Sequence, residues 1–142
     1  MDIFILGGAR TPSGSYLGSL SSVSAPELGA VAISGALEKA NIKKENVDEV
    51  AMGHVVQAGT GQAPARQAAM GAGIPSESGA TTINKMCGSG MKSIMFGHDS
   101  IKAQQNNIVV AGGLENMTNA PYILKDARSG QRLGHGKLID SM

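Results

Sequence analysis

The sequence alternates between short apolar runs and segments with helical spacing, and this alternation restricts the fold more than any other feature. The runs with strand character cover residues 3–6, 49–56, 80–86 and 107–111. The last run is uninterrupted by polar residues, as expected for a parallel strand that is buried on both faces. The resulting order, βαβαβαβ, predicts an α/β fold in which helices are layered on a parallel or mixed sheet.

The segments between these runs carry helix boundary signals. The tetrapeptide at residues 24–27, Ser-Ala-Pro-Glu, has the pattern of a capping box, and Asn41 suits the left-handed residue that ends a helix. A second helix is expected over residues 63–72. A third is expected to begin at Cys87 or Gly88. Its apolar face would comprise Met91, Ile94, Met95, His98 and Ile101, with His98 as a buried histidine.

Composition excludes several classes of protein. The chain is 42% hydrophobic and 16% charged, with a formal net charge of +1, so we expect neither a disordered tail nor a nucleic-acid-binding surface. No apolar run approaches the roughly 20 residues that span a bilayer, and no signal or transit peptide is visible. We therefore expect a soluble cytoplasmic protein with no membrane contact. The single Cys and the widely spaced His54, His98 and His135 predict neither an internal disulfide nor a metal site.

The residues best suited to chemistry surround Cys87. This Cys lies where a buried strand is expected to turn into a helix, and amides at a helix N-terminus favour a thiolate over a thiol. Gly88 and Gly90 leave the first turn without side chains, so that a substrate carbonyl could approach both the sulfur and the backbone N–H. This arrangement suits acyl transfer through a thioester. The alternative is that Cys87 is a small buried apolar residue, and the residues alone leave both interpretations open.

Other candidate sites are weaker. There is no G-x-G-x-x-G sequence and no phosphate-binding loop, so the glycine pairs do not predict nucleotide binding. Glu115 follows the end of a strand, where open sheets place their binding crevices. A carboxylate that accepts hydrogen bonds from neighbouring amides is the simpler interpretation of Glu115.

Several segments together resemble the thiolases, the family of the acetyl-CoA acetyltransferases. The sequence NKMCGSGM at residues 84–91 is similar to the nucleophile motif of that family. Further similar segments are GARTP at 8–12, SAPELG at 24–29, GQAPARQAA at 61–69, VAGGLENMTNAPY at 110–122 and GKLIDSM at 136–142. The resemblance runs in order along essentially the whole chain.

The resemblance implies a thiolase-like layered fold. Residues 1–116 would form the N-terminal α/β domain without its last strand, and residues 117–142 would begin the loop domain. Cys87 would take the acyl group from an acyl-CoA thioester, with its backbone N–H as an oxyanion donor and with Gly88 and Gly90 beside the substrate. CoA would be a substrate, and no metal or redox cofactor is implied.

The resemblance also implies that parts of the catalytic machinery lie elsewhere. The family's general-base His in a Gly-His-Pro sequence, its second Cys and its Asn-Glu-Ala-Phe sequence have no counterpart here. We therefore expect acetyl-CoA C-acetyltransferase activity, in the direction of acetoacetyl-CoA formation or thiolysis, only with a complementary C-terminal thiolase chain in a homo- or hetero-oligomer. Without that half, the third helix would expose Met91, Ile94 and Met95.

Two alternatives remain. One is a catalytically inactive truncated chain that acts as a binding or assembly partner. The other is a decarboxylating condensing enzyme, which also uses a nucleophilic Cys. The sequence around Cys87 favours the thiolases over the condensing enzymes.

Overall fold

The computed structural model describes residues 2–142, and its centre is a parallel three-stranded sheet. The strands β1 (Glu49–Gly53), β2 (Gly79–Ile83) and β3 (Val109–Gly113) lie in the order β2-β1-β3. Glu49 pairs with Gly79 on one side and with Val109 on the other. Since the strands are parallel, their C-terminal ends meet at one edge, and the predicted α/β fold with a parallel sheet is confirmed.

The strand ends differ from the expected ones. β1 and β2 end three residues before residues 56 and 86, because the residues that follow them form loops held by side-chain hydrogen bonds. β3 begins two residues later than expected and continues through Gly112-Gly113, where backbone pairing persists without side chains. These shifts leave the C-terminal ends of the three strands beside one another, with glycines ending β1 and β3.

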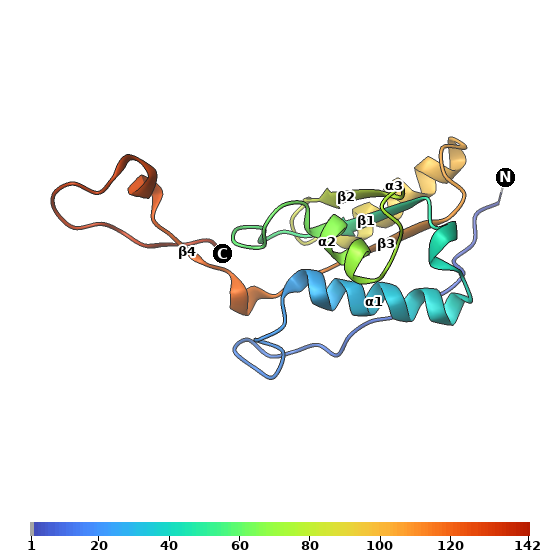
Figure 1. The fold of residues 1–142 in the computed structure, drawn as a ribbon, viewed down its shortest axis with the longest axis horizontal. Helices are drawn as coiled ribbons and strands as arrows, with labels where there is room; N and C mark the ends of the chain where they lie inside the picture. The colour runs from blue at the N-terminus through green and yellow to red at the C-terminus, as the bar shows by residue number, and fades with distance from the viewer. Residues whose placement is uncertain (1) are drawn as a thin grey trace.

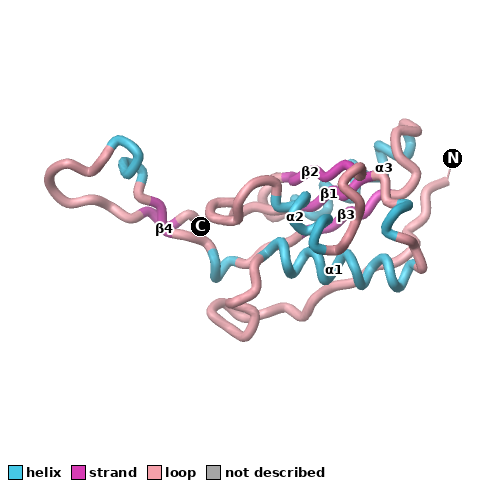
Figure 2. The backbone as a smooth tube through the Cα atoms, viewed as in Figure 1, coloured by secondary structure: helices cyan, strands magenta, loops and turns pink. Residues whose placement is uncertain are grey.

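Helices cover both faces of the sheet (Figures 1 and 2). α1 spans Ala25–Ala40, α2 spans Pro64–Gly71 and α3 spans Ser89–Lys102. Gly97 of α3 packs against Val109 and Ala111, whereas Val110 packs against the core cluster that includes α1. Because successive residues of a strand face opposite sides, α3 covers one face of β3 and α1 lies on the other.

Both ends of α1 agree with the sequence analysis. The Ser24 hydroxyl accepts a hydrogen bond from the Glu27 amide at 3.3 Å, and the Glu27 carboxylate accepts one from the Ser24 amide at 2.8 Å. Hydrogen bonds from the Ser24 hydroxyl and then its amide lower the pKa of Glu27 below its ordinary value. Asn41 ends the helix with φ 53° and ψ 40°, in the left-handed region.

The core lies between α1, α2 and the sheet and is built from small and branched apolar side chains. A Cβ at Gly29 of α1 would come within 2.7 Å of Leu114 and 3.1 Å of Ala68, so a glycine is required for this close packing. The buried members of the core are Ala25, Ala30, Ile33, Leu37, Val47, Val50, Met52, Ala65, Ala68, Ala69, Ala72, Ile74 and Leu114.

The expected first strand is not formed. Residues 3–6 belong to neither sheet, and within the described chain residues 3–8 make no backbone hydrogen bond. Phe4 and Ile5 are 75% and 91% exposed. A strand needs a partner edge, and an apolar cleft separates this segment from the open edge of β3. The segment instead runs beside α1, where Gly7 lies against Ala40.

The chain beyond residue 121 projects away from the body (orange to red in Figure 1). It contains a short antiparallel pair, β4 (Tyr122–Ile123) with β5 (Ile139–Asp140). Single 3-10 turns cover Lys44–Asn46, Met117–Asn119 and Lys125–Ser129. The domain boundary between residues 116 and 117 stays a prediction. None of the helices in residues 2–142 has the length and apolar character to cross a bilayer.

Candidate active site

Cys87 lies in the turn between β2 and α3. Its side chain is exposed and its thiol is free. α3 begins at Ser89 with Gly88 as its N-cap, which is one or two residues later than the expected starts at Gly88 and Cys87. Cys87 therefore precedes the helix. The position of Cys87 at a strand-to-helix turn is as predicted, and its exposure does not fit the interpretation as a buried apolar residue.

The residue before Cys87 has an unusual backbone. Met86 has φ 49°, in the left-handed region that a residue with a long side chain rarely adopts. This conformation costs roughly 1–2 kcal/mol and must be held by its surroundings. The turn therefore presents the thiol on a strained backbone.

Hydrogen bonds from two side chains hold this turn. The Asn84 side-chain oxygen accepts from the Met86 amide at 3.1 Å. The Ser89 hydroxyl accepts from the Lys85 amide at 2.8 Å and donates to the Met86 carbonyl. Because the Ser89 hydroxyl bonds both Lys85 and Met86, the start of α3 and the turn form one hydrogen-bonded unit. The Ser89 side chain is buried.

The amide of Cys87 has no partner. Among residues 2–142, the neighbouring amides of Gly88 and Ser89 donate to the carbonyls of Lys85 and Met86, whereas the Cys87 amide donates to nothing. An N–H without a partner next to a free thiol is available to donate to an oxyanion. The same residue can therefore supply a nucleophile and a donor to the negative charge that forms on a carbonyl oxygen.

Glycines allow the start of α3 to lie directly on the strand ends. A Cβ at Gly53 of β1 would come within 2.5 Å of the Gly90 nitrogen and 2.7 Å of the Ser89 Cβ. A Cβ at Gly90 would face the Gly112 carbonyl at 3.7 Å, and one at Gly88 would meet only Lys85 at 3.5 Å. Gly90 thus faces the end of β3. The roles of Gly88 and Gly90 in admitting a substrate stay predictions.

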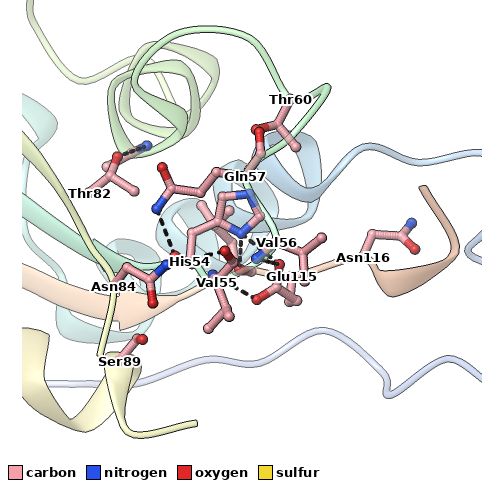
Figure 3. Close-up of polar contacts among 12 residues, drawn as sticks. His54, Val55, Val56, Gln57, Thr60, Thr82, Asn84, Ser89, Glu115 and Asn116 are labelled. Atoms are coloured by element: carbon pink, nitrogen blue, oxygen red, sulfur yellow. Dashed lines mark hydrogen bonds and ion pairs between the residues drawn. The ribbon is translucent and has the colours of Figure 1, made fainter. Parts of the chain in front are cut away.

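Glu115 follows β3 and caps the loop after β1 (Figure 3). Its carboxylate accepts from the amides of Val55 at 2.9 Å and Val56 at 3.1 Å, which confirms the prediction for this residue. His54 Nδ1 lies 2.8 Å from the same carboxylate and 3.0 Å from the Leu114 carbonyl. Because both neighbours of Nδ1 are acceptors, Nδ1 carries the proton.

His54 is the residue of this site that the sequence analysis missed. It is 1% exposed, and its Nε2 is buried without a hydrogen-bond partner in the described residues. In the sequence it looks like an isolated histidine after a strand. The sequence did contain a signal for this residue. His54 precedes a Val-Val pair at the end of one strand, and Glu115 follows the end of another. Parallel strands bring such ends together.

The other histidine prediction is wrong. His98 was expected on a buried face of α3, but its side chain is 52% exposed and lies 3.1 Å from the Asp99 carboxylate. The periodicity of α3 places His98 on the same face as Met91 and Ile94, and in residues 2–142 nothing covers that face. No cluster of three or more His, Cys, Asp or Glu side chains in the described residues could hold a metal ion.

No base is bonded to the thiol. None of the hydrogen bonds or ion pairs in residues 2–142 joins the Cys87 sulfur to a His or a carboxylate. The site thus holds a candidate nucleophile whose sulfur contacts no proton-transferring side chain within the described residues.

Comparison with known proteins gives a family assignment. The family model described as the N-terminal domain of thiolase matches residues 3–142. The chain is 53% identical over 141 residues to acetyl-CoA acetyltransferase 2 of Arabidopsis thaliana, and the match covers 99% of this chain and 35% of the relative. A cytosolic acetyl-CoA acetyltransferase of Gibberella zeae is 51% identical (99% and 35% covered). A mitochondrial one of Rattus norvegicus is 50% identical (98% and 32% covered). The chain thus spans about a third of the length of these relatives.

Proposed function

Because the chain belongs to the thiolase family, we propose that it contributes the acyl-accepting cysteine of an acetyl-CoA C-acetyltransferase. The observation that carries this proposal is the exposed Cys87 thiol beside its own unpaired amide. The relatives named above are acetyl-CoA acetyltransferases, which supports an acyl-CoA thioester as the substrate.

The proposed reaction begins at the Cys87 sulfur. The thiolate attacks the thioester carbonyl, and the Cys87 N–H donates to the oxyanion that forms. The bond between the carbonyl carbon and the CoA sulfur then breaks, so that CoA leaves as a thiol and the acyl group stays on Cys87. In synthesis a second acetyl-CoA loses an α-proton to the base, its α-carbon bonds to the acetyl carbonyl carbon, and acetoacetyl-CoA leaves as the bond to the Cys87 sulfur breaks. In thiolysis Cys87 instead attacks the 3-oxo carbonyl of acetoacetyl-CoA, the C2–C3 bond breaks, acetyl-CoA leaves with a proton on its α-carbon, and the acetyl group passes from Cys87 to free CoA. A CoA thioester is a substrate in both directions, and the proposal needs no metal or redox cofactor.

We propose that a complementary C-terminal thiolase portion supplies the general base. Two observations support this partner: the relatives are almost three times as long as the matched chain, and no base contacts the thiol. A further support is an open apolar cleft of about 750 Å³ between the N-terminal segment, α1, α3 and the outer edge of β3. Among its lining residues are Phe4, Leu6, Ala36, Ile94, Ile101 and Val110.

The exposed face of α3 supports the same partner. Met91, Ile94 and Met95 are 67%, 52% and 50% exposed, as the sequence analysis expected for a chain without its second half. An apolar face of this kind marks an interaction surface. We propose that the remaining two-thirds of a thiolase covers it within a homo- or hetero-oligomer. A cytoplasmic location stays a prediction, since the relatives include cytosolic and mitochondrial proteins.

The test is acetylation of Cys87 in a reconstituted complex. The chain is co-expressed with the part of the Arabidopsis relative that follows the matched region, and the purified complex is incubated with acetyl-CoA. We expect mass spectrometry of the peptide that contains Cys87 to show one acetyl group, and the Cys87→Ala complex to show none. A complex that forms but carries no acetyl group on Cys87 would contradict the proposal and favour the non-catalytic binding partner.

A further inference from the structure

Two loops that are far apart in the sequence meet beside the nucleophile turn. Glu115, at the end of β3, holds the first residues after β1 by accepting from the amides of Val55 and Val56. His54 adds a third contact to the same carboxylate at 2.8 Å. The backbone of residues 54–56 is therefore fixed to the end of β3 by one carboxylate (Figure 3).

Asn84 connects this fixed loop to the turn that carries Cys87. Its side-chain nitrogen donates to the Val55 carbonyl at 3.2 Å, and its side-chain oxygen accepts from the Met86 amide at 3.1 Å. Val55 thus makes both contacts in the path, with its amide bonded to Glu115 and its carbonyl bonded to Asn84. The path runs from Glu115 through Val55 and Asn84 to the residue before Cys87.

The end of this path is the strained residue of the turn. Met86 has φ 49°. Its backbone N–H donates a hydrogen bond to the Asn84 side chain, and its carbonyl accepts one from the Ser89 hydroxyl. A left-handed methionine persists only if its surroundings enforce it. If the Asn84 contact were removed, the Met86 amide would lose its hydrogen bond, and only the bonds from Ser89 to the Met86 carbonyl would still restrain the residue before Cys87.

We propose that Glu115 and Asn84 are positioning residues for Cys87, acting through Val55 and the Met86 amide. Neither is hydrogen-bonded to the sulfur, and their role is to hold the turn that presents the thiol and the Cys87 N–H. The inference rests on the proposed function only in treating Cys87 as the nucleophile. The hydrogen-bonded path itself is independent of the acyl group that Cys87 accepts.

The first test measures the rate at which iodoacetamide alkylates Cys87. We expect Asn84→Ala and Glu115→Ala each to slow alkylation about fivefold, which is the order expected when one restraining hydrogen bond is lost. Asn84→Asp keeps an acceptor for the Met86 amide and should restore part of the rate. Asn119→Ala is the matched control, because the Asn119 side chain donates to the Val23 carbonyl, at 3.4 Å, outside the path. Unchanged rates in both Ala variants would overturn the proposal.

The second test separates positioning from a general loss of stability. No hydrogen bond joins Glu115 to Met86, so faster exchange in Glu115→Ala that is confined to the turn at Met86 requires the restraint to pass through Val55 and Asn84. We expect faster exchange there, measured by NMR, while the amides inside α1 keep their protection. Faster exchange throughout the chain, or no change at Met86, would overturn the proposal.

These tests fail separately from the test of the proposed function. Alkylation and exchange are measured on the chain without acyl-CoA, so the positioning path can be present when no acetyl group is transferred. Conversely, acetylation of Cys87 with equal efficiency in the wild-type complex and in the Asn84→Ala complex would retain the proposed function and overturn the positioning role.

Discussion

Gly53 shows how much the candidate site depends on a residue without a side chain. It ends β1 where the first turn of α3 crosses, and the atoms nearest to a Cβ there belong to backbone, at 2.5 Å. Backbone cannot turn aside as a flexible side chain can. The start of α3, and with it the turn that carries Cys87, is therefore placed by direct contact with β1.

We expect Gly53→Ala to destabilise the chain by about 2 kcal/mol, because inserting a methyl group into a packed contact forces the backbone to shift. Urea denaturation measures this change, and acetylation of Cys87 in the reconstituted complex should slow in parallel. Gly79→Ala is the control, since its Cβ would meet Glu49 at an ordinary 3.4 Å. Equal stability of the two variants would show that α3 is not held by this contact.

The strands of the sheet are joined at their start by Asp48. Its carboxylate accepts from the amides of Asn107 at 2.7 Å and Ile108 at 2.9 Å, just before β3. The bonds from Ile108 and then Asn107 lower the pKa of Asp48 below its ordinary 3.8. A lowered pKa means that the ionised group stabilises the fold above pH 3.8, and that this contribution is lost as the pH falls below it.

We therefore expect Asp48→Asn to make the stability of the chain less sensitive to acid. Near neutral pH the variant should be slightly less stable than wild type, since the charged acceptor is gone. As the pH falls below 3.8, the difference between the two should shrink. Thermal unfolding across this range measures it, with Asp2→Asn as a control that removes an exposed carboxylate without a hydrogen bond. A difference that stays constant with pH would contradict this account.

α3 is an element with one packed face and one open face. On the packed face, a Cβ added at Gly97 would lie 3.1 Å from the side chain of Val109. On the open face, Met91 is 67% exposed. A helix with an uncovered apolar face binds hydrophobic probes and promotes self-association. The open face of α3 is therefore available for binding and contributes little to the stability of the isolated chain.

Met91→Lys should lower the fluorescence of the dye ANS bound to the chain alone. The free energy of unfolding should change by no more than about 0.5 kcal/mol, because an exposed side chain makes few contacts to lose. Leu133→Lys removes an equally apolar side chain that is 98% exposed but lies beyond β4, and it serves as the control. If Leu133→Lys lowers the dye signal as much as Met91→Lys does, α3 is not the apolar surface that binds it.

Local chemistry in the sequence predicted the ends of α1 well, because Ser24, Glu27 and Asn41 act on the backbone within a few residues. Contacts between distant residues were harder to predict. The residues of the His54–Glu115 pair are 61 positions apart in the sequence, and their contact depends on the register of β1 with β3. Helical spacing showed that His98 shares a face with Met91, but spacing carries no information on whether another element covers that face.

The same limit applied to residues 3–6. These residues are β-branched, aromatic or otherwise apolar, as is typical of a strand. Composition shows that a segment prefers to form a strand, but it does not show whether a partner strand lies beside it. The turn at Cys87 was predicted as a strand-to-helix junction, but the left-handed Met86 was not. Only the hydrogen bonds from Asn84 and Ser89 reveal why that conformation is held.

At the scale of the whole molecule, the apolar segment of residues 3–8 packs against α1 but does not pair with a strand. Residues 3–8 make no backbone hydrogen bond, yet Gly7 and Ala9 pack against Ala40 and Gly35 of α1. The cleft of about 750 Å³ lies between this segment and the outer edge of β3. Unpaired strand edges and exposed apolar side chains are stable in water only at a cost, and covering them lowers the free energy.

We therefore expect the amides of residues 3–8 to exchange rapidly in the chain alone and slowly in the reconstituted complex. Hydrogen–deuterium exchange followed by mass spectrometry of the N-terminal peptide measures the change. Ile5→Asp should weaken assembly at least tenfold. It should not alter the stability of the isolated chain, since Ile5 is 91% exposed there. Leu133→Asp, at a side chain that is 98% exposed, should leave assembly unchanged. A complex that forms while residues 3–8 still exchange rapidly would mean that the remaining thiolase portion covers α3 and leaves the cleft open.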